Sequence, residues 1–177
     1  MLRESLDLFR SPRLAHEAHM LVKRARDVLT TGCIVAIRPI GRNSYKIVSL
    51  SLSKGYWKAG GVALALRRGD YESIHYALVS PRGFRCTCSN SIRTSSRADA
   101  VLERLGLAPT ASRFVLCKHV VAALAKLCSM GVISLRSKEV RLSVLRGLGV
   151  LYLAIEDPER VRKSAELIKR LFAEEHR

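Results

Sequence analysis

Four side chains in two pairs could bind a metal ion. Cys86 and Cys88 form the first pair, Cys117 and His119 form the second, and residues 89–116 separate the two. Three thiolates with one imidazole are a ligand set that structural zinc ions take in tetrahedral geometry. Because four protein ligands close the coordination shell, the set predicts a structural zinc ion, whereas a catalytic zinc keeps one position open.

The spacing within each pair predicts the element that holds it. Residues i and i+2 of a strand point to the same side, so Cys86 and Cys88 can reach one ion from the end of a strand. Positions i and i+2 of a helix do not face each other. Cys117 is therefore expected at or before the N-cap of a helix that begins at about residue 118, with His119 in its first turn. The positive end of that helix would favour thiolates.

The five cysteines allow other interpretations besides a metal site. Buried free thiols are one alternative, because cysteine behaves as a small hydrophobe, but the neighbours Arg85, Thr87 and Lys118 are polar. Disulfides are a weaker alternative, because no secretory signal is recognisable and the number of cysteines is odd. Cys33 and Cys128 are interpreted as core or spare thiols outside the metal site.

The order Cys86-x-Cys88, an insert, and then Cys117-x-His119 resembles the SWIM zinc finger. In that family two β-strands precede the first pair and a helix follows the second. Ala122, three residues after His119, resembles the extended motif of the recombination-accessory subgroup that includes the Shu-complex SWIM subunit. The resemblance implies DNA binding, pairing with a RecA-family recombinase paralog, and a role in homologous recombination or DNA repair. SWIM fingers also occur in transposase-like proteins, so a transposase- or transcription-related DNA-binding module is an alternative.

Positive charge is concentrated in the middle of the chain. The net charge is +16; residues 32–98 hold eleven basic and two acidic side chains, whereas residues 156–177 hold six of each. A basic field focused on one part of a fold is typical of proteins that bind a polyanion, most often nucleic acid. The alternative is a surface that only keeps the protein soluble. Single- or double-stranded DNA is therefore the expected partner.

The expected DNA contacts are basic side chains beside the ligands, in the insert and in a glycine-rich stretch. They are Arg85, Lys118, Arg93, Arg97, Lys54 and Lys58, together with the aromatic Trp57. Lysines and arginines neutralise phosphates, and an aromatic ring among them can stack on bases. For Trp57 the alternative is a hairpin tip whose indole fills the core.

Hydrophobic periodicity predicts an α+β fold in which a small antiparallel sheet leads into the finger and helices follow it. Helices are expected over residues 11–30 and 98–107, from about 118 to 127, from 137 and from 157, and strands over 33–38, 44–52, 62–67, 71–79 and 84–86. Residues 89–96 form a polar stretch that is either mobile or ordered on a phosphate backbone. His75 is expected to be a structural strand histidine.

Three parts of the chain are predicted on this basis: an N-terminal helical segment (1–31), the sheet with the zinc finger (32–130) and C-terminal helices (131–177). The apolar face of the C-terminal helices either closes the core or docks a partner. The second option makes the protein an adaptor without DNA binding of its own.

Catalysis is not expected, because Asp70 and Glu72 are the only acids within residues 32–98 and form no two-metal cluster. No apolar run reaches the roughly 18 residues that a membrane span needs. The chain has no glutamine and two asparagines. Scarcity of these thermolabile amides is typical of hyperthermophiles, so we expect a cytoplasmic protein of a thermophilic prokaryote. Together with the resemblance to the recombination-accessory subgroup, this suggests a nucleoid-associated protein of a thermophilic archaeon.

Overall fold

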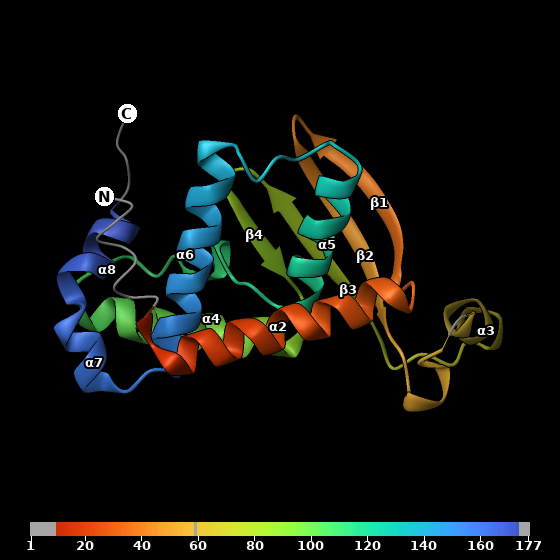
Figure 1. The fold of residues 1–177 in the computed structure, drawn as a ribbon, viewed down its shortest axis with the longest axis horizontal. Coiled ribbons are helices and arrows are strands. Elements are labelled where there is room, and N and C mark those ends of the chain that lie inside the picture. The colour runs from red at the N-terminus through yellow and green to blue at the C-terminus, as the bar shows by residue number, and fades with distance from the viewer. Residues whose placement is uncertain (1–9, 59, 174–177) are drawn as a thin grey trace.

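The computed structural model describes residues 10–58 and 60–173. Within these residues four strands form one antiparallel sheet in the order β1-β2-β3-β4 (Figure 1). The strands are β1 (Ile34–Gly41), β2 (Ser44–Ser51), β3 (Ser73–Ser80) and β4 (Gly83–Cys86). Helix α5 (Lys118–Ser129) packs on β3 and β4, and α2 (Pro12–Thr30) packs on α5. The predicted α+β class is confirmed.

Helix α2 begins where the Ser11-Pro12 pair predicts a helix start. The Ser11 hydroxyl accepts a hydrogen bond from the Leu14 backbone N–H, and Pro12 occupies the first turn, where its missing N–H costs nothing. The same hydroxyl donates to the carboxylate of Glu156, which follows α6 (Lys138–Ile155). The cap therefore also connects the N-terminal helix to the C-terminal helices.

The strand predicted over residues 62–67 is wrong, because Gly61–Arg68 form helix α3. A short apolar run rich in alanine and leucine fits a helix as well as a strand, and both residues are strong helix formers. Gly60 and Gly69 flank the helix in the left-handed conformation that glycine adopts readily. The 3₁₀ helix η2 (Lys54–Tyr56) precedes it.

The polar stretch 89–96 has regular structure. It forms the first half of a single helix, α4 (Ser89–Arg104), so the helix predicted over 98–107 begins nine residues earlier. Ser91 and Ser95 are buried and fall on the same helix face as Ala98 and Leu102. Helix α4 packs on α6 through this face of small side chains, so tertiary packing outweighs the low helix propensity of serine.

The C-terminal helices close a core with α4. Helix α6 starts at the predicted cap, Ser137, and α7 (Pro158–Lys163) starts at Asp157, whose carboxylate accepts from two backbone N–H groups. Helix α8 (Ala165–Phe172) follows. Their apolar faces are buried with α4, the segment after the 3₁₀ helix η3 (Ala111–Arg113) and one another. None of the helices that the structure describes is long and apolar enough to cross a membrane.

Helix α6 lies so close to the segment before Cys117 that only glycine fits at one position. A Cβ atom at Gly147 would lie 2.6 Å from Leu116 Cγ and 2.7 Å from the Phe114 carbonyl oxygen. A Cβ atom at Gly149 would lie 2.7 Å from Leu171 Cδ2, the far end of a flexible side chain.

We expect Gly147→Ala to destabilise the protein by about 1–3 kcal/mol, the usual cost of overpacking. This loss outweighs the roughly 1 kcal/mol that alanine gains over glycine in a helix. Gly149→Ala is the matched control and should cost less, because the Leu171 side chain can move. The urea concentrations at the unfolding midpoints measure the stability of the two variants. A Gly147→Ala protein that unfolds at the same urea concentration as the wild type would contradict this packing.

Candidate metal centre

The four predicted ligands converge at the junction of the sheet and two helices. Cys86 ends β4, Cys88 is the N-cap of α4, Cys117 is the N-cap of α5, and His119 lies in the first turn of α5. Their ligand atoms all lie within 4.8 Å of one another, and Cys86 Sγ is 3.8 Å from His119 Nδ1. Metal–sulfur bonds of about 2.3 Å place the sulfurs of a tetrahedron about 3.8 Å apart. The cluster could therefore hold one metal ion.

The cluster is part of the protein interior. Cys88 and Cys117 are buried in a hydrophobic core together with Phe84 and Leu127. The Nε2 atom of His119 is also buried and has no hydrogen-bond partner among the described residues. A buried nitrogen without a partner is uncommon and calls for a water or an ion. The nitrogen of His119 that faces the sulfurs is Nδ1, and the burial and donor chemistry of the cluster fit a bound metal ion.

Two helix N-termini meet at the cluster. Because Cys88 and Cys117 are N-caps, the free N–H groups and positive dipole ends of α4 and α5 point toward the sulfurs. The Cys88 backbone N–H also contacts Cys86 Sγ at 3.5 Å. The sequence predicted the contribution of α5 only. The contribution of α4 was missed because its start was expected at residue 98.

The pKa values of the three thiols shift in opposite directions. Hydrogen bonds from the thiols of Cys117 and Cys86 lower the pKa of Cys88 strongly. Hydrogen bonds to Cys86 and Cys88, and then burial, raise the pKa of Cys117 well above its usual value. The hydrogen bond with Cys117 lowers the pKa of Cys86, but the hydrogen bond to Cys88 and burial together raise it to about 12. A metal ion that takes all three sulfurs must therefore displace two protons.

His75, which the sequence predicted to be structural, supports the cluster from β3. Its ring lies 4.6 Å from that of His119 between centroids, and its Nε2 atom lies 2.9 Å from Ser51 Oγ and 3.0 Å from Ser73 Oγ. Burial lowers the pKa of His75, and the neighbouring His119 lowers it further. A neutral His75 therefore packs against the ligand. The β3–β4 register pairs Ala77 with Cys86 and so brings residue 75 toward residue 88. Pairing the two strands as a hairpin with its turn at residues 81–82 would have predicted from the sequence that His75 lies near the ligands.

The predicted DNA contacts lie in three separate places. Arg85 is exposed on β4 and lines a groove with Arg82 and Arg113. Arg93 and Arg97 are exposed on α4 and line another groove of about 220 Å³ between α2, α4 and α6. The structure thus brings the two α4 arginines together but keeps them apart from Arg85.

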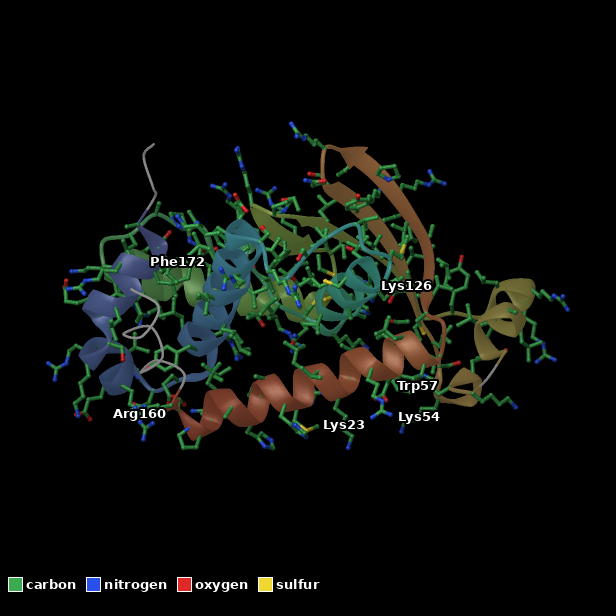
Figure 2. All side chains as sticks on the ribbon, turned by 45° about the horizontal axis from the view of Figure 1, so that its top comes forward. Lys23, Lys54, Trp57, Lys126, Arg160 and Phe172 are labelled. Atoms are coloured by element: carbon green, nitrogen blue, oxygen red, sulfur yellow. The ribbon has the colours of Figure 1, made fainter. Side chains whose placement is uncertain are left out.

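The third place is the segment around Trp57. Trp57 and Lys118 line one small pocket. Lys54, which lies near Trp57 in Figure 2, and Lys58 are both exposed. Trp57 is 52% exposed and donates its indole N–H to the Leu52 carbonyl oxygen at 2.7 Å. The indole does not fill the core; the neighbouring Tyr56 is buried instead.

We expect Cys117→Ser to lose the bound metal and much of its resistance to unfolding, because it removes a buried ligand and leaves a hydroxyl among apolar side chains. Cys128→Ser is the matched control: this cysteine is on the same helix but outside the cluster. Metal content by elemental analysis and thermal unfolding test both variants. Full metal retention by Cys117→Ser would remove this ligand assignment.

Metal binding is expected to strengthen as the pH rises. The raised pKa values of Cys86 and Cys117 mean that both thiols carry protons at neutral pH in the metal-free protein. Releasing two protons per ion makes the apparent affinity change by roughly 100-fold per pH unit in this range. Calorimetry of zinc titrations in buffers of different ionisation enthalpy counts the released protons, and release of none would contradict the protonation state assigned here.

The chain was also compared with protein-family models, with curated proteins and with solved structures. None of the three comparisons finds a match. The resemblance to the SWIM finger consequently rests on the order, types and spacing of the ligands, and the metal centre rests on the geometry described above.

Proposed function

We propose that this chain is a non-catalytic, zinc-stabilised protein of the SWIM type that binds DNA. The observation that carries the proposal is the buried cluster of Cys86, Cys88, Cys117 and His119, at the end of an antiparallel sheet and the start of a helix. This is the arrangement that the resemblance to the SWIM finger implies. No catalytic residue is proposed.

Zinc is the proposed metal because of the donor set. Soft thiolate ligands select zinc, copper(I) or iron–sulfur clusters, and a tetrahedral set of three sulfurs and one nitrogen is typical of structural zinc. Three thiolates and a neutral imidazole around Zn²⁺ carry a formal charge of about −1. Lys118 follows the ligand Cys117, and its positive charge acts on His75 beside the cluster, so it would partly compensate this negative charge.

DNA is the proposed partner because three of the predicted contact arginines are exposed and form no salt bridge among the described residues. Arg85, Arg93 and Arg97 have no carboxylate within salt-bridge distance in the part of the chain that the structure describes. Unpaired arginines on a protein of net charge +16 repel one another until a polyanion or salt neutralises them. Phosphate contacts through these side chains fit that requirement.

A role in homologous recombination or repair, with a RecA-family recombinase paralog as partner, follows from the resemblance to the recombination-accessory subgroup. It places the protein with DNA in the cytoplasm, at the nucleoid. The adaptor alternative would use the apolar faces of the C-terminal helices. Those faces are buried in the core, so this alternative needs a different surface, and direct DNA binding is the function we favour.

We expect the metal-loaded protein to bind labelled DNA with an affinity that falls as the salt concentration rises. The logarithm of the affinity should fall linearly with the logarithm of the salt concentration, with a slope of about −0.7 to −0.9 for each phosphate contact. Replacing Arg93 and Arg97 together by alanine should weaken binding and reduce that slope. Arg160→Ala with Lys163→Ala is the matched control, because these side chains already pair with acids on α7. Fluorescence anisotropy measures the affinities, and no binding at low salt would reject DNA as the partner.

A further inference from the structure

Much of one face of the sheet is open to solvent, whereas at one end of that face Leu50, which pairs with Ile74, is buried in a cluster with Tyr56 and Ala65. The alternation along β3 directs Ala77 and Val79 into the core beneath α5, whereas Ile74, Tyr76 and Leu78 point the other way and are 42%, 40% and 37% exposed. Figure 1 shows α5 inside the curve of the strands and no described helix over the opposite side of β1 and β2. We call this opposite side the outer face. An exposed row of large apolar and aromatic side chains on a sheet is typical of a binding surface.

Basic side chains cross this outer face in one row. The strand register pairs Arg38 of β1 with Lys46 of β2, Lys46 with Leu78 of β3, and Leu78 with Arg85 of β4. Directly paired residues of neighbouring strands point to the same side of a sheet. With strands about 4.8 Å apart, the row spans roughly 14 Å. The four strands carry no acidic residue, so nothing within the sheet neutralises the row.

The aromatic ring lies next to this row. Lys46 Nζ is 4.3 Å from the centroid of the Tyr76 ring, and Tyr76 is paired with Val48 on the neighbouring strand. The ring therefore has a positive charge at one side and an apolar neighbour at the other. A nucleobase stacked on such a ring would have its phosphate within reach of a lysine.

The basic row continues into a groove at one end of the sheet. The groove has a volume of about 280 Å³, and Leu78, Arg82, Arg85 and Arg113 line it. Neither Arg82 nor Arg85 has a carboxylate within salt-bridge distance among the residues described. The open end of the sheet thus offers several arginines around an apolar side chain.

We propose that the outer face binds single-stranded nucleic acid, with bases on Tyr76 and Leu78 and phosphates on Arg38, Lys46 and Arg85. This inference rests on the proposed function and specifies which nucleic acid is bound and where. Only a single strand can present unstacked bases to this apolar surface, because a duplex hides its bases and offers mainly phosphates. The acid-free, basic character of the face fits a polyanion better than the apolar surface of a protein partner.

The test compares fifteen-nucleotide oligo(dT) and oligo(U) with a duplex of equal length, using anisotropy on the metal-loaded protein. The first variant carries Arg38→Ala, Lys46→Ala and Arg85→Ala. The matched control carries Lys23→Ala, Arg104→Ala and Lys126→Ala, which removes the same charge from exposed helix positions elsewhere. Tyr76→Ala and Tyr76→Phe test stacking, since only the second keeps the ring. Metal content and thermal unfolding confirm that every variant is folded.

We expect tighter binding to oligo(dT) than to the duplex. Tighter binding to oligo(U) than to oligo(dT) and the duplex would keep the outer face as a single-strand site but overturn DNA as the proposed partner. The face variant should lose at least about tenfold more affinity than the control. The slope of log affinity against log salt concentration should become shallower by about 2, because phosphate contacts are lost. Tyr76→Ala should weaken binding roughly tenfold and Tyr76→Phe much less.

Equal losses in the face variant and the control, or preference for the duplex, would overturn the inference and leave the proposed function standing. No binding of any oligonucleotide at low salt would overturn both.

Discussion

The central constraint on the structure is the convergence of four candidate metal ligands at a hydrophobic core. Two come from the end of β4 and the start of α4, and two from the start of α5, with residues 89–116 between the pairs. Closing a loop of this length costs conformational entropy, and in the metal-free cluster a thiolate stays buried with only thiols and two helix ends to stabilise it. An ion that bonds to all four ligands would supply the missing stabilisation and fix the sheet against both helices.

Strand alternation allows one small sheet to serve two purposes. On β4, Arg85 points outward while the next residue, Cys86, points to the ligand cluster; on β3, Tyr76 points outward while His75 packs on His119. The proposed nucleic-acid surface and the metal centre are therefore one residue apart along the chain, on opposite sides of the sheet. A change at the metal centre is expected to reach the outer face through the backbone of these two strands.

Much of this arrangement could be predicted from local signals. Ser11-Pro12, Ser137 and Asp157 marked helix starts, the first hairpin followed from its strand pattern, and Cys117 was placed correctly at an N-cap. Two elements were predicted wrongly. The serine-rich start of α4 has low helix propensity and is helical with Ser91 and Ser95 buried, on a helix that packs on α6, which the sequence does not display. Gly61–Arg68 was assigned to a strand because a short run of alanine and leucine suits a helix and a strand equally.

The central claim is that Cys86, Cys88, Cys117 and His119 hold one zinc ion, and X-ray absorption at the zinc edge tests it most directly. The account predicts one zinc per chain, with three sulfur atoms at about 2.3 Å and one nitrogen at about 2.0–2.1 Å. Protein that contains no zinc, or zinc bound mainly by oxygen atoms, would contradict it.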